Sequence, residues 1–134
     1  MTQEDKMLLI KDLSSRLPYA VHVQHIGGVS GILHDISIYH KYNGNDNIYD
    51  AICYTDFLRD ENSITIEYFK PYLFPLSSMT EEQKQEYQYI TERWMYDPSY
   101  LISDNIDWLN KNHFDYRNLI NKNLAIDATG LNIY

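Results

Sequence analysis

The middle of the chain constrains the fold most, because short strand-like runs alternate there with polar turns. Four runs alternate or concentrate apolar side chains as β-strands do: residues 19–26, 32–40, 48–54 and 63–69. The glycines of residues 27–31 and the polar stretches 42–47 and 59–62 separate them. These connections are too short for the crossover that a parallel pair needs. The sequence therefore predicts a four-stranded antiparallel meander.

The second run has two distinct faces. Ile36 and Ile38 fall on one side of a regular strand, and Asp35 and Ser37 fall on the other. The glycines of residues 27–31 favour a turn, since they lack the Lys and the Ser or Thr that follow the last glycine of a phosphate-binding loop. Glycines also let short twisted strands curl, so a partly closed small barrel is the alternative architecture.

A helix is predicted before the strands. Thr2, with Asp5 three residues later, marks its start, and Pro18 marks its end. The residues expected to share one side of this helix are Met7, Ile10 and Leu13 or Ser14.

More helices are predicted after the strands. Thr80 and Gln83 form a capping box. The side chains of that helix expected to face the sheet are Tyr87, Ile90 and Trp94. Two short helices should follow at residues 105–112 and 115–121, with Asp115 as the N-cap of the second. We therefore expect one α+β domain, residues 1–134: an N-terminal helix, the meander, then two or three C-terminal helices packed on the sheet.

Charge and composition exclude several classes of function. The formal net charge is −8, and the 11 Lys and Arg residues are dispersed, which disfavours binding to nucleic acid or to an anionic membrane. The start of the chain is polar and acidic, and the longest early apolar run, residues 7–10, is far shorter than the ~20 residues of a membrane helix. We expect a cytoplasmic protein. Cys53 is the only cysteine, so we expect a small buried apolar side chain rather than a disulfide or a thiolate zinc site.

Histidines and tyrosines invite functional interpretations that have simpler alternatives. A zinc site would have to combine His22 or His25 with His34 and Asp35, whereas surface histidines need no such convergence. The 13 tyrosines would suit a recognition surface, but a tyrosine-rich core and rim explain them without a partner. We predict no metal and no cofactor.

The densest cluster of versatile side chains closes the chain. His113 and Asp115 would make a general base with its orienting carboxylate, and Arg117 would bind an anion. No nucleophile motif accompanies them. In the alternative interpretation Trp108 and Phe114 belong to the core, Asp115 caps a helix and Arg117 pairs with a carboxylate.

Three blocks carry a resemblance. Residues 70–73 and 75–82 resemble the start of a recurrent block, and residues 106–110, 113–117 and 119–120 resemble the closing block, of uncharacterised small proteins from gut anaerobic bacteria and their phages and mobile elements. Residues 1–18 are similar as well, so the resemblance covers roughly half the chain.

The chain departs from that family at four positions. Phe74 stands where the family suggests Arg, Asn112 where it suggests a second His, and Asn118 and Asn123 where it suggests Gly. At Asn123 the change is tolerable, because asparagine is the next-best residue for a left-handed cap. The resemblance implies an architecture and a habitat, but no activity.

We expect a non-enzymatic protein-binding or regulatory accessory protein, encoded by a phage or mobile element and acting on a host protein. The acidic charge favours a basic protein partner. The candidate binding residues are His113, Arg117, Tyr116, Trp108 and Tyr72. No catalytic residue is assigned. Two alternatives stay open: a small enzyme with its site around His113, Asp115 and Arg117, and an acidic mimic of nucleic acid. Homo-oligomerisation stays open as well.

Overall fold

The computed structural model describes residues 1–25, 27–44, 46–56, 64–93, 95–97 and 103–134. Its helices are α1 (Gln3–Arg16), α2 (Glu81–Arg93) and α3 (Ser103–Lys111), with short 3-10 turns η1 (Leu17–Tyr19), η2 (Ile66–Tyr68) and η3 (Leu76–Ser78). Its strands are β1 (His22–His25), β2 (Ser30–Asn43), β3 (Asp46–Thr55), β4 (Ile64–Thr65), β5 (Phe69–Pro75), β6 (Phe114–Asp115) and β7 (Ile126–Asp127). The expected α+β class and N-terminal helix are confirmed.

Helix α1 begins at the predicted cap. The hydroxyl of Thr2 accepts a hydrogen bond from the backbone N–H of Asp5, at 3.1 Å. The buried side of the helix is formed by Leu9, Ile10, Asp12, Leu13 and Arg16. Met7, which we expected to share a side with Ile10, is exposed. The buried side is centred between positions 9 and 13 with Ile10 at its edge, whereas Met7 falls on the outer face of the helix.

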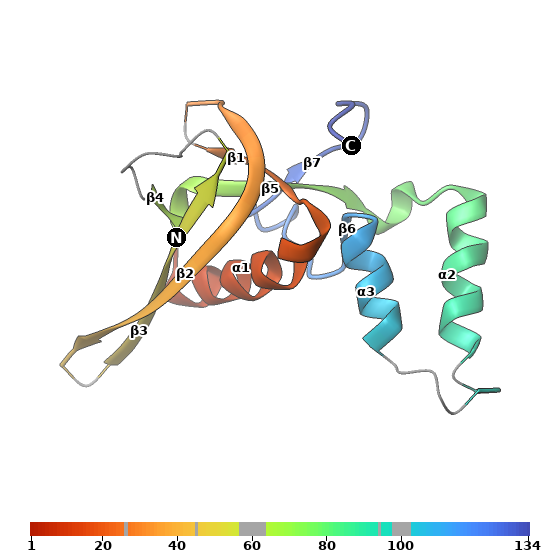
Figure 1. Cartoon of the computed structure of the whole chain (residues 1–134), viewed down its shortest axis with the longest axis horizontal. Helices are drawn as coiled ribbons and strands as arrows, with labels where there is room; N and C mark the ends of the chain where they lie inside the picture. The colour runs from red at the N-terminus through yellow and green to blue at the C-terminus, as the bar shows by residue number, and fades with distance from the viewer. Residues whose placement is uncertain (26, 45, 57–63, 94, 98–102) are drawn as a thin grey trace.

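The sheet is mixed rather than a simple meander (Figure 1). Strands β1 to β4 pair antiparallel in chain order, as predicted. The predicted fourth strand is wrong beyond Thr65, because η2 follows there. The sheet instead continues on the other side of β1: β5 pairs with β1 antiparallel, and β6 and β7 pair with β5 in parallel. The parallel pairs are possible because the connections after β5 are long and contain helices. Across the described strands the path from β4 to β6 is open, not a closed barrel.

Helix α2 packs mainly on α3 and reaches only the β6 edge of the sheet, whereas the prediction placed it on the sheet. Its capping box is present, since the backbone N–H of Thr80 donates to Gln83 and the N–H of Gln83 donates to Thr80. However, Tyr87 and Ile90 pack against a small core that α3 and β6 supply, formed by Trp108, Leu109 and Phe114. Figure 1 shows α3 between α2 and the rest of the fold. Trp94 lies outside the described residues.

The predicted helix at residues 115–121 is also wrong. Phe114 and Asp115 form β6, and turns follow. The Asp115 carboxylate nevertheless accepts two backbone N–H groups, from Leu119 and Ile120, both at 2.9 Å. Asn118 adopts a positive φ of 62°, which a continuous right-handed helix does not allow. Asn123 has a φ of 58° and confirms the expectation that asparagine serves in a left-handed position there.

The main core lies between α1 and the sheet. Its fully or nearly buried members are Leu9, Ile10, Leu13, Val21, Val23, Leu33, Ala51, Cys53, Ile66, Phe69, Leu73, Leu119, Leu124 and Ala125. Cys53 is buried as predicted, and burial, with a smaller contribution from Asp35, raises the pKa of its thiol to about 12. In the described part of the chain, every helix is too short or too polar to cross a membrane.

Candidate functional site

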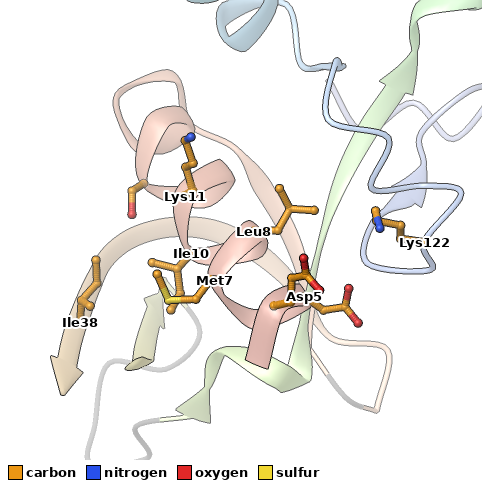
Figure 2. A pocket seen from close by; sticks show the side chains of 9 residues that line it. Asp5, Met7, Leu8, Ile10, Lys11, Ile38 and Lys122 are labelled. Atoms are coloured by element: carbon orange, nitrogen blue, oxygen red, sulfur yellow. The ribbon is translucent and has the colours of Figure 1, made fainter. Parts of the chain in front are cut away.

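A hollow of about 620 Å³ lies over the outer face of α1. Figure 2 shows α1 between Ile38, on β2, and Lys122, in the C-terminal turns. We call this surface the α1 hollow, and it is lined by Glu4, Asp5, Met7, Leu8, Ile10, Lys11, Ser14, Ile38 and Lys122.

The apolar part of the α1 hollow is a continuation of the core face. Ile38 is paired across the strands with the buried Ala51, and two residues earlier Ile36 is paired with the buried Cys53. Cross-strand partners share one face of a sheet. The β2–β3 hairpin projects beyond α1 (Figure 1), so α1 covers only part of the apolar face of these two strands. As a result Ile38 is 52% exposed, and Met7 on the facing helix is 39% exposed.

Charged side chains surround the apolar floor of the α1 hollow. Glu4 and Asp5 lie in the first turn of α1, Lys11 lies near its middle, and Lys122 lies beside it. The ion pairs of the described residues use none of these four side chains. Glu4 and Lys11 are seven residues apart on one helix, a rise of about 10 Å, so they are too far apart to pair with each other. The hollow therefore offers free charges of both signs around apolar side chains.

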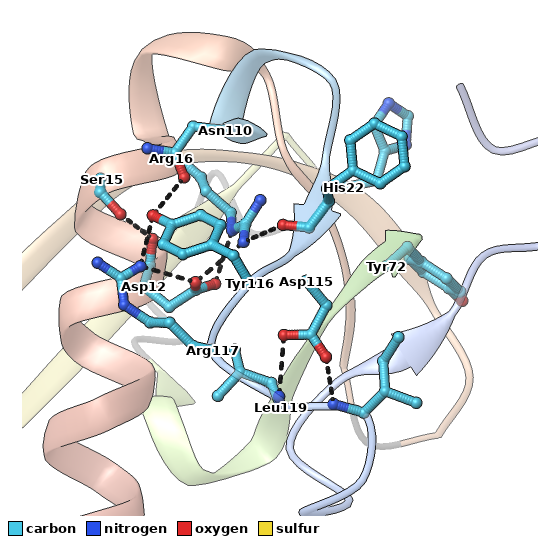
Figure 3. Close-up of polar contacts among 12 residues, drawn as sticks. Asp12, Ser15, Arg16, His22, Tyr72, Asn110, Asp115, Tyr116, Arg117 and Leu119 are labelled. Atoms are coloured by element: carbon cyan, nitrogen blue, oxygen red, sulfur yellow. Dashed lines mark hydrogen bonds and ion pairs between the residues drawn. The ribbon is translucent and has the colours of Figure 1, made fainter. Parts of the chain in front are cut away.

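The closing block, by contrast, is occupied by a buried ion pair (Figure 3). Asp12 and Arg16, one helical turn apart on α1, are both 0% exposed. The carboxylate of Asp12 accepts from Nε of Arg16 at 2.7 Å and from its Nη2 at 3.1 Å. Nη2 also donates to the backbone oxygen of Phe114, at 2.7 Å. This charge-assisted contact ties α1 to β6.

Arg117 and Tyr116 extend the same network. Nη1 of Arg117 donates to Asp12 at 3.2 Å and to the hydroxyl of Tyr116 at 2.6 Å. That hydroxyl donates to the side-chain oxygen of the buried Asn110, at 2.8 Å. The guanidinium carbons of Arg16 and Arg117 lie 5.2 and 4.5 Å from the centre of the Tyr116 ring. The alternative interpretation of Arg117, pairing with a carboxylate, is confirmed.

His113 lies in a strained and partly buried position. Its φ of 62° is left-handed, and its ring stacks on that of Tyr134 with centroids 3.6 Å apart. Nδ1 is buried and has no hydrogen-bond partner. Burial, then the nearby Arg16 and His22, lower the pKa of His113 to about 4. The ring is therefore neutral at pH 7.

The other two candidate binding residues are core side chains. Trp108 is 8% exposed and stacks on Phe114 with centroids 5.7 Å apart. Tyr72 is 5% exposed, and its hydroxyl lies 3.0 Å from Oγ of Ser30. Neither side chain offers a surface to a partner in this conformation.

The closing block does not hold the parts of a general base. Both carboxylate oxygens of Asp115 accept backbone N–H groups, while Nδ1 of His113 has no partner. A catalytic dyad needs the base and its orienting carboxylate within hydrogen-bond reach. Among the described residues, no group of three or more His, Cys, Asp or Glu side chains is arranged to hold a metal ion. The structure brings His113, Tyr116 and Arg117 into one region, where their contacts stabilise the fold.

Sequence reasoning missed the α1 hollow. Its signals were weak: Met7 places an apolar side chain on the outer face of α1, and Ile38 extends the apolar face of β2. Neither signal says where the covering helix ends relative to the strand, which is a property of the packed fold.

Removing the carboxylate of Asp12 should destabilise the protein strongly. Asp12→Asn keeps the shape but leaves two guanidinium groups without a countercharge, so we expect the free energy of unfolding to fall by about 3–5 kcal/mol. Denaturant unfolding measures this change. The control is Glu81→Gln in the exposed Glu81–Lys84 pair, which should change the free energy of unfolding by less than about 0.5 kcal/mol. A similarly small effect of Asp12→Asn would contradict the importance of the buried pair.

His113 should make stability depend on pH. Its pKa is about 4 in the folded protein and near 6.5 when unfolded, so the unfolded chain binds the proton first as the pH falls. This group should not affect stability above pH 6.5. Between pH 6.5 and 4 the free energy of unfolding should decline, and only by roughly 1–2 kcal/mol, because the ring is partly exposed and water screens its charge.

The comparison for this pH effect is His113→Asn, since asparagine tolerates the left-handed backbone. We expect the variant to be less stable at pH 7, through loss of the stacking on Tyr134, but to show a shallower decline of melting temperature toward pH 4. Parallel melting curves for the two proteins across this range would show that His113 does not carry the effect.

Comparison with known proteins returns no match. No family model matches the chain, and no curated protein or solved structure matches it either. The resemblance to small proteins of gut anaerobes and their mobile elements stays a prediction.

Proposed function

We propose that the chain is a non-enzymatic protein-binding protein and that the α1 hollow is its contact surface. The observation that supports this most is the exposure of Met7 and Ile38 beside the core. Adjacent exposed apolar side chains with a polar rim are typical of protein–protein contact sites. Met7 and Ile38 contribute little to the core, so contact with a partner would explain why apolar side chains occupy these exposed positions.

The state of the closing block also favours binding over catalysis. Asp115 is engaged with the backbone, and Arg117 is engaged with Asp12 and Tyr116. Releasing either group to act on a substrate would break contacts that hold the C-terminal turns. A small enzyme with its site around His113, Asp115 and Arg117 is therefore the weaker proposal.

The charge of the hollow refines the kind of partner. The whole chain is acidic, with a net charge of −8, which favours approach of a basic protein. The rim itself carries both signs, through Glu4, Asp5, Lys11 and Lys122. A partner segment with apolar side chains flanked by opposite charges would match it. Cytoplasmic residence, a regulatory role and action on a host protein remain part of this proposal.

Site-specific photo-crosslinking tests the surface. A photoreactive amino acid replacing Ile38 should give a discrete crosslinked species in the cells that produce the chain, because the side chain borders the hollow. The matched control is the same replacement at Ser37, which is exposed on the opposite face of β2. We expect no discrete adduct from position 37.

Substitution in the hollow supplies the second arm of this test. Met7→Asp should abolish the Ile38 adduct and leave the melting temperature within about 2 °C, since Met7 is not part of the core. Equal crosslinking from positions 37 and 38, or no adduct at all from position 38, would contradict the proposed function.

A further inference from the structure

We propose that the occupant of the α1 hollow is a second copy of this chain, with the two α1 helices packed antiparallel across a two-fold axis. This inference rests on the proposed function, because it uses the same surface, but it replaces the basic partner with a second copy. Two copies of net charge −8 repel each other at long range, and paired charges of opposite sign offset this repulsion at the contact. The order of side chains along the outer face of α1 supports the inference.

Four side chains form one stripe on that face. Glu4, Met7, Leu8 and Lys11 occupy positions i, i+3, i+4 and i+7 of the helix, and all four line the hollow. Glu4, Met7 and Lys11 are exposed, and Leu8 is partly exposed. The stripe therefore reads acidic, apolar, apolar, basic from one end to the other.

This order is complementary to itself. A two-fold axis midway between Met7 and Leu8 places Glu4 opposite Lys11 of the other copy, and Met7 opposite Leu8 of the other copy. Each contact occurs twice, as in every isologous interface. A parallel arrangement would instead bring Glu4 against Glu4 and Lys11 against Lys11, and like charges in contact are unfavourable.

The surroundings favour a helix as the occupant. Figure 2 shows Ile38 on one side of α1 and Lys122 on the other, so an incoming helix has an apolar flank and a charged flank. The ion pairs of the described residues leave Glu4 and Lys11 without partners, so both are available to a second copy. One α1 helix against another buries less than the ~1,600 Å² of a standard interface. We therefore expect a dimer that dissociates on the order of micromolar concentration.

Charge reversal tests the pairing. Sedimentation equilibrium of the full chain should show a monomer–dimer equilibrium. Glu4→Lys and Lys11→Glu should each weaken self-association at least about tenfold, because each places like charges together twice.

Mixing the two charge variants supplies the rescue. An equimolar mixture should associate again, because the lysine introduced at position 4 of one variant then opposes the glutamate introduced at position 11 of the other. At the second contact the unchanged Lys11 of the first variant opposes the unchanged Glu4 of the second. The double variant should dimerise like the wild type.

Cysteine crosslinking tests the direction of the helices. Met7→Cys lies beside the proposed axis and should form a disulfide-linked dimer under mild oxidation. Ser14→Cys lies on the same face, but in the antiparallel arrangement its two copies are roughly 20 Å apart along the helices, too far for a disulfide. Cys53 is buried and does not compete. A disulfide through position 14 would overturn the antiparallel arrangement.

The outcomes separate this inference from the proposed function. If the wild type remains monomeric at several hundred micromolar, or if mixing the two charge variants restores nothing, the second copy is not the occupant. An adduct from position 38 that contains a different polypeptide would then leave the proposed function intact. An adduct of twice the mass of the chain, lost in Glu4→Lys and recovered in the mixture, supports both.

Discussion

The buried ion pair between Asp12 and Arg16 is the contact on which the rest of the structure depends. Both side chains are wholly inaccessible, and Arg16 reaches from α1 to the backbone oxygen of Phe114. Removing two charges from water is costly, so the pair persists only because each group is hydrogen-bonded several times. One carboxylate oxygen also accepts from Arg117. Through these bonds α1 holds β6 in place beside β5. The two residues that form this link, Arg16 and Phe114, are 98 positions apart in the chain.

This anchoring decides what the closing block can do. The guanidinium of Arg117 and the hydroxyl of Tyr116 satisfy one another and their neighbours, and Asp115 holds the turn that follows it. In the sequence these residue types suggest acid–base chemistry. Here their side chains make hydrogen bonds that a helix or sheet would otherwise supply. The C-terminal turns have few backbone hydrogen bonds of helix or sheet, so side chains must satisfy their polar groups. Among the buried side-chain nitrogen and oxygen atoms of the described residues, Nη1 of Arg16 and Nδ1 of His113 are left without a hydrogen-bond partner.

The parts of the fold that sequence predicts are those decided by near neighbours. The caps at Thr2 and Thr80 and the glycine turn before β2 follow from residues three or four positions apart. The parallel strands β6 and β7 do not, because two-residue strands carry no periodicity and exist only through pairing with a distant partner. The helix predicted at Asp115 failed for a related reason. Its capping signal was real, but the carboxylate caps a turn that left-handed asparagines prevent from continuing as a helix. The α1 hollow exists because β2 extends beyond the part of the sheet that α1 covers. The length of that extension is defined only by the packed structure.

The inner anchoring of α1 bears directly on its outer face. A helix held by a buried ion pair and by Leu9 and Leu13 presents Glu4, Met7, Leu8 and Lys11 in fixed relative positions. Binding through this face would cost little backbone entropy, because the helix is already formed and anchored before a partner arrives. This preorganisation matters most for a small interface, where the cost of ordering a flexible segment would exceed the gain from a few apolar contacts. On the proposed function, the same ion pair that commits the closing block to the fold would make a single exposed helical stripe sufficient for recognition.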